Sequence, residues 1–272
     1  MGTGLSESPA ELTGPVPVSS VRLEKRLNER FVKAMATYHL IEDDDRILVG
    51  LSGGKDSLLL LELLAKRAKI LHPRFEVEAL HVRMENIHYE TNTDYLQSFC
   101  DRHDVRLHIR TTRFDVFPSP TVELTAPTQQ SLVRKQKQPC FLCSWMRRKQ
   151  LFNLAQELGC NKIALGHHQD DLIHTALMNL TFQGRFDTMP AHLKMRKMPL
   201  SIIRPLCMIE ESDIRAIAKM RGYQKQIKRC PHETDSHRTD IRRLYETIEQ
   251  INPEARFSIW RALNAGGKLI EE

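Results

Sequence analysis

Apolar residues along the chain follow two alternating spacings. Short apolar or alternating runs, typical of strands in a buried sheet, occupy 46–51, 75–82, 106–110, 162–166 and 201–205. Other apolar positions recur at helical spacing, over 21–40, 58–70, 92–103, 144–158, 170–181 and about 210–220. Strands that alternate with helices in this way predict an α/β fold, with a Rossmann-like parallel sheet covered by helices on both faces.

Three segments fall outside this alternation. Residues 1–20 are rich in Gly, Ser, Pro and Thr and are expected to be disordered, whereas 238–263 is amphipathic and predicts a C-terminal helical tail. Residues 111–139 hold four prolines and many polar side chains, which favours a long loop or lid. The sequence therefore predicts one large domain over 21–225, followed by a C-terminal segment over 226–272.

Composition narrows the class of protein. Of 272 residues, 41% are hydrophobic and 27% are charged, which is ordinary for a folded, water-soluble chain. No apolar stretch approaches the roughly 20 residues that a membrane span needs, and the N-terminus lacks the charged start and apolar core of a secretory signal. We therefore expect a cytoplasmic protein with no membrane partner. The six cysteines of such a chain are not expected to form disulfides.

Positive charge is concentrated in short clusters. The formal net charge is +6 and the isoelectric point is about 9.0. Lys and Arg gather at 134–137, 147–149, 194–197 and 225–229. Such clusters favour a polyanionic partner, because Lys and Arg neutralise the phosphates of nucleic acids. A solvated basic surface is the plainer explanation when charge is considered alone.

The junction between the first expected strand and its helix carries the most informative motif. It consists of Ser52, Gly53, Gly54, Lys55, Asp56 and Ser57. The glycines allow backbone conformations that let an anion approach, and the free N–H groups and dipole of a helix start attract that anion. Lys55 adds a positive charge, whereas Asp56 would repel a bare phosphate and is expected to hold Mg²⁺. The motif therefore predicts a phosphate-binding loop, with a Gly-Ser turn of no function as the alternative.

The order S-G-G-K-D-S differs from the G-x-x-x-x-G-K-[ST] loop of common NTPases. It resembles the PP-loop of the ATP-pyrophosphatase superfamily, whose members hold the pyrophosphate of ATP and cleave between the α and β phosphates. The resemblance implies that a substrate oxygen attacks the α phosphorus and becomes an adenylate, which is a good leaving group.

Two cysteines form a C-x-x-C at the point where the long loop meets a helix. Cys140 and Cys143 can ligate one metal or act as a redox pair that carries sulfur as a persulfide. Cys230, in a polar and basic loop, is the best third ligand. Three cysteines allow a [4Fe–4S] cluster with one open iron, or zinc completed by His232 or His237, and unliganded thiols are the plain alternative. The remaining cysteines are expected to be small buried hydrophobes: Cys100, Cys160 and Cys207.

Three motifs then occur in a recognisable order. They are S-G-G-K-D-S at 52–57, C-x-x-C-S-x-x-R-R at 140–148 and G-H-H-x-D-D at 166–171. Together, over about 21–240, they resemble the tRNA 2-thiocytidine synthetase (TtcA) family, a branch of the PP-loop tRNA thiolases with an adenine nucleotide alpha hydrolase-like fold. The resemblance implies that ATP activates C2 of a cytidine in the tRNA anticodon loop, where sulfur replaces oxygen. It also favours a [4Fe–4S] cluster over zinc.

The resemblance implies specific roles for the motif residues. Cys140, Cys143 and Cys230 would hold the cluster, whose open iron would carry the sulfur. The phosphate loop would hold the pyrophosphate, with Asp56 on Mg²⁺. The other expected site residues are Asp170 and Asp171 near the reacting phosphate, Arg147 on the α phosphate or base oxygen, the backbone of Leu80, His81 and Val82 against adenine, and Gly166 and His167 near the nucleotide.

The remaining expectations concern partners and competing functions. tRNA would be the substrate, a cysteine desulfurase or free sulfide the sulfur donor, and a homodimer the assembly implied by the family. The target base must leave its stack to react, and Trp145 is expected to be a buried anchor rather than a surface on which that base stacks. The alternatives are a PP-loop amidotransferase or ligase without sulfur chemistry, and a nucleotide-binding iron–sulfur sensor that is not an enzyme.

Overall fold

A mostly parallel sheet of seven strands forms the centre of the computed structural model, which describes residues 18–85, 91–113, 139–224 and 237–271. The strand order is β3-β2-β1-β4-β6-β5-β7. The strands are β1 (Asp45–Gly50), β2 (Phe75–Met84), β3 (Arg106–Thr112), β4 (Lys162–Ala164), β5 (His192–Lys194), β6 (Ser201–Ile203) and β7 (Ile270–Glu271). The predicted α/β fold is confirmed, but β5 runs antiparallel to β6 and was not expected from the sequence.

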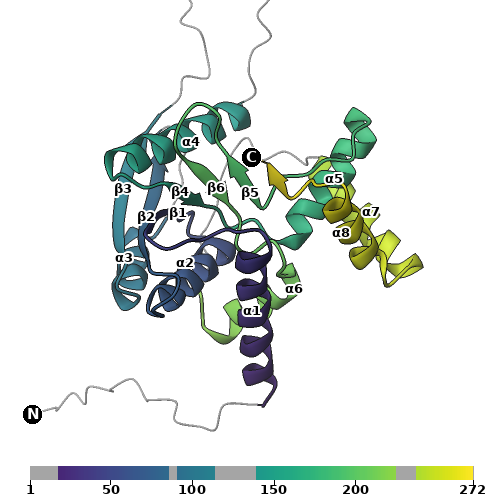
Figure 1. Cartoon of the computed structure of the whole chain (residues 1–272), viewed down its shortest axis with the longest axis horizontal. Helices are drawn as coiled ribbons and strands as arrows, with labels where there is room; N and C mark the ends of the chain where they lie inside the picture. The colour runs from purple at the N-terminus through teal and green to yellow at the C-terminus, as the bar shows by residue number, and fades with distance from the viewer. Residues whose placement is uncertain (1–17, 86–90, 114–138, 225–236, 272) are drawn as a thin grey trace, which may run out of the picture.

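Helices cover both faces of this sheet (Figure 1). They are α1 (Val18–Thr37), α2 (Lys55–Ala68), α3 (Thr93–Arg102), α4 (Pro139–Glu157), α5 (Gln169–Gln183), α6 (Glu211–Met220), α7 (His237–Ile251) and α8 (Ala255–Ala265). The larger core lies on the side of α1, α2, α3 and α6, with Phe31, Leu60 and Ile214 fully or almost fully buried. A smaller core lies under α4 and includes Leu80 and Leu154. Strands β1, β2, β3, β4 and β6 are parallel, so their carboxyl ends lie on the same side of the sheet. This side is called the sheet edge below.

Helices α1 and α2 begin three residues before their expected starts, and two larger differences from the expectation lie further along the chain. Helix α4 begins at Pro139 instead of residue 144, so Cys140 and Cys143 lie on the helix itself rather than on a loop before it. The tail over 238–263 forms two helices, because Pro253 lacks the N–H that a continuous helix needs. Most of the segment expected to be disordered, and most of the expected long loop, lie outside the described residues.

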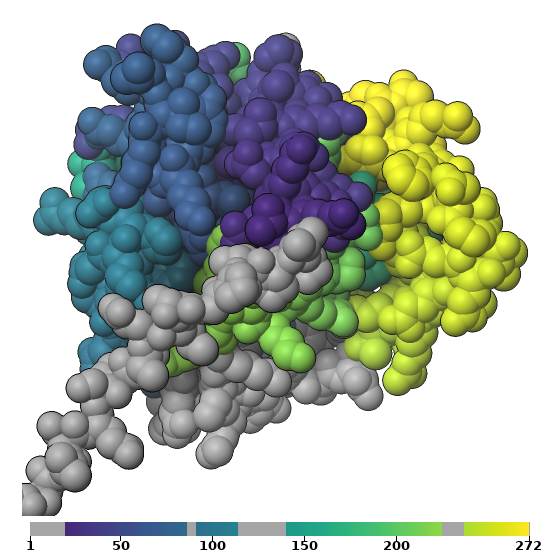
Figure 2. Space-filling view, turned by 90° about the horizontal axis from the view of Figure 1, so that it is seen from below, coloured from purple at the N-terminus to yellow at the C-terminus, as the bar shows by residue number. Residues whose placement is uncertain are grey.

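The two C-terminal helices pack against α5. Ile173 and Leu177 of α5 form a small core with Ile241 and Tyr245 of α7, and β7 pairs with β5 at the edge of the sheet. Seen from below, the purple N-terminal residues lie between the blue residues that follow them and the yellow C-terminal helices (Figure 2). In the part of the chain that the structure describes, no helix has both the length and the apolarity needed to cross a membrane.

The three cysteines outside the motifs are buried, as predicted. Cys100 and Cys207 have no exposed surface and Cys160 is 7% exposed. Burial raises the pKa of Cys100 to about 12 and that of Cys160 to about 11. These thiols therefore stay protonated at neutral pH and act as core residues.

Candidate active site

The phosphate loop joins β1 to α2. Gly53 has φ of +82°, a conformation that favours glycine. Gly54 caps α2 without a side-chain hydrogen bond, so the N–H groups at the start of the helix point toward the sheet edge. Ser57 Oγ donates to the Gly54 carbonyl (2.9 Å) and lies 3.1 Å from Ser52 Oγ. The loop therefore lies at a helix N-terminus, which is the usual protein site for phosphate, and its two hydroxyls bond to each other and to the loop backbone.

Lys55 lies between two carboxylates. Its Nζ is 2.8 Å from Asp56 Oδ1 and 3.1 Å from Glu211 Oε1, at the start of α6. Burial opposes the charge of Lys55, but Asp56 and Glu211 raise its pKa, so the ammonium group stays protonated. Arg215 and Lys55 in turn outweigh the burial of Glu211 and lower its pKa to about 2. The cation expected from the sequence is therefore charged and held in place.

His168 is a buried histidine at the centre of a cluster of acids. It is 4% exposed, and its ring nitrogens lie 3.5 Å from Asp170, 3.5 Å from Asp171 and 3.9 Å from Asp56. Burial opposes protonation of His168, but these three carboxylates raise its pKa. The backbone N–H of His168 also donates to Asp171 Oδ2 (3.1 Å), and this hydrogen bond caps α5. The end of β4 thus links the phosphate loop to both acids of the G-H-H-x-D-D motif.

The two acids of that motif have different surroundings. Asp170 Oδ1 accepts from Arg256 Nη2 (2.9 Å), and Oδ2 accepts from the Glu211 N–H (2.8 Å). Burial opposes ionisation of Asp170, but His168, followed by Arg256 and the Glu211 N–H, holds the pKa of Asp170 well below its usual range. The Asp171 side chain is more open, with 36% of its surface exposed. Asp170 is therefore committed to protein contacts at both oxygens, and Asp171 is the acid that solvent or a ligand can reach.

His167 faces a different set of groups. Arg204 Nε donates to His167 Nδ1 (3.3 Å). Burial, followed by the charge of Arg204, lowers the pKa of His167 to about 4. His167 is therefore neutral at physiological pH and half-buried at the sheet edge. Of the two histidines, His168 is the one whose ring lies beside the acids.

Gly166 is in close contact with the phosphate loop. A Cβ at this position would lie 3.1 Å from both the Asp56 carbonyl carbon and the Ser57 nitrogen. Both neighbours are backbone atoms, so a side chain at position 166 must displace the first turn of α2. The structure thus gives a physical reason for glycine at the start of the G-H-H-x-D-D motif.

Gly166→Ala is expected to weaken ATP binding, because about 1–3 kcal/mol of overpacking strain falls on the phosphate loop. Equilibrium binding of ATP to the variant checks this. Gly50→Ala is the matched control, since its Cβ would lie equally close, at 3.1 Å, to the Leu165 side chain, which can move aside. Equal ATP affinities for the two variants would contradict the assigned role of Gly166.

The C-terminal part of β2 extends beyond β1, beside the phosphate loop. Pairing with β1 ends at Gly50 and Leu80, whereas β2 continues to Met84. His81 is 3% exposed, and its Nδ1 donates to the Leu51 carbonyl (2.8 Å), with the proton assigned from that contact. Burial, together with Arg147 and Arg83, lowers the pKa of His81. The Leu80 carbonyl is already bonded to the Leu51 N–H (2.9 Å), so the backbone beyond Leu80 is the part that extends past β1.

The C-x-x-C lies on the first turns of α4, above the same sheet edge. Cys140 is exposed and Cys143 is half-buried, and a spacing of three residues puts both thiols on neighbouring positions of one helix face. This arrangement suits two thiolate ligands of one metal group. Cys230, the third expected ligand, lies outside the described residues, as does His232. Within the described residues, no group of three or more His, Cys, Asp and Glu could hold a metal ion.

The rest of this end of α4 divides into two faces. Leu142 and Met146 pack on the core with Cys143, and Arg147 is close enough to His81 to lower its pKa. Trp145 points outward and is 48% exposed, with Lys149 Nζ 5.6 Å from its ring centre. The expectation of a buried Trp145 was therefore wrong, because the outward face of α4 begins there. Arg148 is also exposed, with Nε donating to the Ser144 carbonyl (3.2 Å).

Two residues that reach the site have no motif of their own. Glu211 contacts Lys55 from the start of α6, and Arg256 contacts Asp170 from α8. Their positions depend on how α6 and α8 pack against the main sheet, which the local sequence does not show. The only signal is the acidic start of α6, since acids are favoured in the first turn of a helix.

Comparison with known proteins identifies the family. Residues 20–248 match the family described as the PP-loop domain (ATP_bind_3). A tRNA-cytidine(32) 2-sulfurtransferase of Pseudomonas putida (strain GB-1) is 31% identical over 251 residues, which cover 92% of this chain and 87% of that protein. The protein of the same name from Teredinibacter turnerae (strain ATCC 39867 / T7901) is 35% identical over 203 residues, covering 74% of this chain and 63% of the relative.

A solved structure shares the fold. The U34-tRNA thiolase NcsA from Methanococcus maripaludis, determined with its [4Fe-4S] cluster, superposes with a TM-score of 0.67 at 24% sequence identity. The superposition covers 92% of this chain and 80% of NcsA. Together with the phosphate loop at the start of α2, these matches show that the chain belongs to the PP-loop family, in the branch of the tRNA-cytidine 2-sulfurtransferases.

Proposed function

We propose that the protein uses ATP to adenylate the C2 oxygen of a cytidine in the tRNA anticodon loop and then replaces that oxygen with sulfur. The observation that carries this proposal is the meeting of three motifs at one sheet edge. The phosphate loop at α2, the acid cluster around His168 and the C-x-x-C of α4 all lie where the parallel strands end. Open α/β sheets bind their ligands at this edge.

The first half of the reaction follows from the phosphate loop. The N–H groups at the start of α2 and the charged Lys55 would hold the pyrophosphate of ATP, and the backbone of His81 and Val82 would lie against adenine. Asp56 and the exposed Asp171 are the carboxylates suited to Mg²⁺, which would neutralise the triphosphate. The base oxygen attacks the α phosphorus, pyrophosphate leaves, and Arg147 would stabilise the growing negative charge.

The second half depends on the cysteines. Cys140 and Cys143, with Cys230, would hold a [4Fe–4S] cluster, which when bound presents sulfur to the activated base. Sulfur attacks the carbon that bears the adenylated oxygen, the C–O bond breaks, and the oxygen leaves in AMP. A cysteine desulfurase or free sulfide would supply the sulfur. tRNA, as the partner, fits the Lys and Arg clusters along the chain, and a homodimer is the proposed assembly.

The test is product analysis with purified protein. The full chain, reconstituted anaerobically with iron and sulfide, is incubated with ATP, sulfide and bulk tRNA. We expect AMP and pyrophosphate, together with a thiocytidine in the digested tRNA. Cys143→Ala should lose iron and thiocytidine while retaining ATP binding, whereas Cys160→Ala, which removes a buried thiol outside the motif, should retain all three.

Each outcome separates the proposal from its alternatives. Absence of both iron and thiocytidine after reconstitution would contradict the sulfur chemistry and favour an amidotransferase or ligase. Thiocytidine formation by Cys143→Ala would contradict the role of Cys143 but not thiolation itself. ATP binding without release of AMP would favour a sensor that is not an enzyme.

A further inference from the structure

A groove opens between α2, α3 and the turn after α6. Its volume is about 830 Å³, within the range of pockets that hold small molecules. None of its lining residues belongs to the phosphate loop, the acid cluster or the C-x-x-C. The groove is therefore a second site, separate from the proposed ATP site, and nothing in the reaction described above uses it.

One end of the groove is cationic. Lys66, Arg102 and Arg221 line it, against the buried carboxylate of Glu62, and Arg221 also pairs with Glu24 at 3.0 Å. Glu62 accepts from Lys66 (2.7 Å) and also pairs with Arg221 and with the Tyr223 hydroxyl. Within the described residues, no carboxylate lies at ion-pair distance from Arg102, and the Lys66 side chain is 56% exposed. A positive surplus therefore faces the solvent in the groove, and an anion would neutralise it.

The pKa of the neighbouring His103 is affected by the same positive charges. The pKa of His103 is lowered by burial first, and then by the charges of Lys66 and Arg102. Among the acids that face it, Asp104 opposes this effect but is itself paired with Lys69 at 2.7 Å. The local potential at this end is therefore positive, in agreement with the ion pairs.

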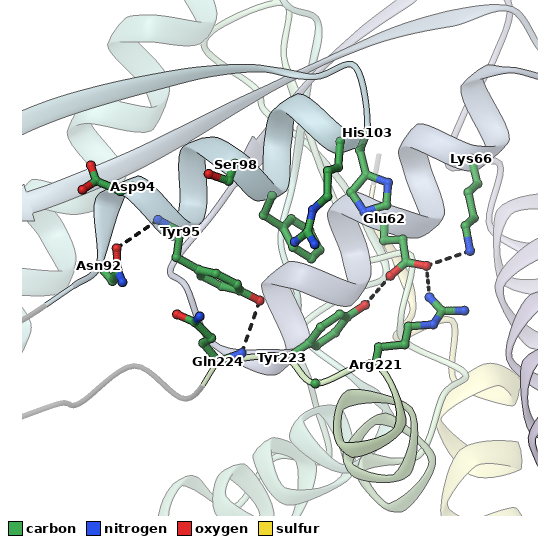
Figure 3. Close-up of a pocket in the computed structure, with 13 residues that line it drawn as sticks. Glu62, Lys66, Asn92, Asp94, Tyr95, Ser98, His103, Arg221, Tyr223 and Gln224 are labelled. Carbon is green, nitrogen blue, oxygen red and sulfur yellow. Dashed lines mark hydrogen bonds and ion pairs between the residues drawn. The ribbon is translucent and has the colours of Figure 1, made fainter. Parts of the chain in front are cut away.

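The middle of the groove is aromatic and rigid. Phe99 meets Tyr223 edge-on with ring centres 5.5 Å apart, and Tyr95 lies 6.0 Å from Phe99. The Tyr223 hydroxyl is held by Glu62, and the Tyr95 hydroxyl accepts from the Gln224 N–H (3.2 Å) (Figure 3). Rings fixed in this way present a surface on which a flat ring can stack at little entropic cost.

The far end of the groove is polar and uncharged apart from one acid. Asn92 and Asp94 lie at this end, on the opposite side of Tyr95 and Tyr223 from the ion pairs of Glu62, and Ser98 lies further along α3, between Asp94 and His103 (Figure 3). Amide and hydroxyl groups can donate to and accept from the edge of a base, whereas the carboxylate of Asp94 can only accept. The groove therefore has three parts in line: hydrogen-bonding groups, aromatic rings and cations.

We propose that this groove binds a nucleotide, with its base against Tyr95 and Tyr223, its phosphate at Arg102 and Lys66, and its base edge toward Asn92. The order of polar, aromatic and cationic groups matches the order of base edge, ring and phosphate in a nucleotide. The ligand is either a free nucleoside monophosphate or one nucleotide of a bound RNA, since both present the same chemistry. The proposal goes beyond thiolation, because it requires neither the cysteines nor sulfur.

Binding by the full chain distinguishes these sources. The ATP site is first saturated with an ATP analogue that carries a methylene group between the α and β phosphorus atoms. AMP, CMP, GMP and UMP are then titrated by calorimetry, and bulk tRNA in a separate series. Arg102→Ala removes a cation that lies over the Phe99 ring (5.5 Å) and has no carboxylate partner among the described residues. It is expected to weaken binding about tenfold or more, as for a lost charge-assisted hydrogen bond. Ser98→Trp fills the groove without changing its charge and should weaken binding at least as much.

The matched control is Arg106→Ala, which removes an exposed arginine of β3 outside the groove. A monophosphate that binds and is weakened by both groove variants identifies a free-nucleotide site. If no monophosphate binds but tRNA is weakened by both groove variants and not by the control, the ligand is a nucleotide of RNA. Unchanged binding of both probes in Arg102→Ala and Ser98→Trp would overturn the proposal, whereas thiocytidine formation by the wild type would still support the thiolation reaction.

Discussion

Lys55→Ala is expected to reduce the ATP-dependent release of AMP and pyrophosphate by about 100- to 1,000-fold, the usual effect of removing one group that stabilises transition-state charge. Lys55 is the cation of the phosphate loop, and its contacts with Asp56 and Glu211 keep it protonated and in place. Without it, two carboxylates would face the triphosphate with no ammonium group between them. The rate of pyrophosphate release with saturating ATP and tRNA measures the effect.

Two control variants separate charge from fold. Lys69→Ala removes an exposed lysine at the end of the same helix, where it pairs with Asp104, and should leave the rate unchanged. Lys55→Arg keeps the charge but changes the geometry, so it should retain more activity than Lys55→Ala. An Lys55→Ala rate close to that of the wild type would show that the loop does not act on the phosphates of ATP.

Asp170→Asn is expected to lower the free energy of unfolding by about 3 kcal/mol, because it removes one partner of a buried ion pair. The Asp170 and Arg256 side chains are 12% and 14% exposed. Arg256 keeps a second partner, Glu249 at 3.1 Å, which places the expected loss at the lower end of the usual range. Urea denaturation at neutral pH measures it.

The pH dependence gives an independent check on the same pair. The pKa of Asp170 is lowered in the folded state, so its stabilisation is complete above the unfolded value of 3.8 and is lost as pH falls through the folded value. The difference in stability between wild type and Asp170→Asn should therefore shrink as pH falls below about 4. It should also shrink as pH rises through the pKa of His168, which Asp170 helps to raise. Asp187→Asn, at an exposed pair with Lys268, is the control and should leave the urea midpoint unchanged. A neutral-pH difference as small as that of the control would contradict the role of Asp170.

Secondary structure and burial could be predicted from the sequence where the local pattern of apolar residues determines them. The strand before and the helix after the phosphate loop follow from apolar runs that the packing does not override, and α2 begins within the motif itself. The buried cysteines were predicted for the same reason, since their neighbours are apolar. Gly166 is in close contact with α2, and its expected place near the nucleotide stays a prediction.

The features that could not be predicted from the sequence depend on contacts between segments that are distant in the chain. Strands β5 and β7 contain three and two residues, too short for any periodicity, and they form only because an existing sheet edge accepts them. The exposure of Trp145 depends on which face of α4 meets the sheet. Glu211 and Arg256 reach the site from helices that follow it in the chain, and no local pattern predicts that packing.

The different contacts of Asp170 and Asp171 likewise could not be predicted from the local sequence. The sequence gives Asp170 and Asp171 as equivalent neighbours at a helix start. Only the packing of α6 and α8 commits both oxygens of Asp170 to Arg256 and the Glu211 N–H, and leaves Asp171 open.

The central claim is that the oxygen of the base leaves in AMP, and isotope transfer tests it most directly. tRNA carrying an isotopic oxygen label at C2 of its cytidines is incubated anaerobically with the reconstituted protein, ATP and sulfide, and the AMP is analysed by mass spectrometry. The account predicts one labelled oxygen in AMP for each thiocytidine formed. Thiocytidine formation with unlabelled AMP, and the label released to water, would contradict adenylation of the base.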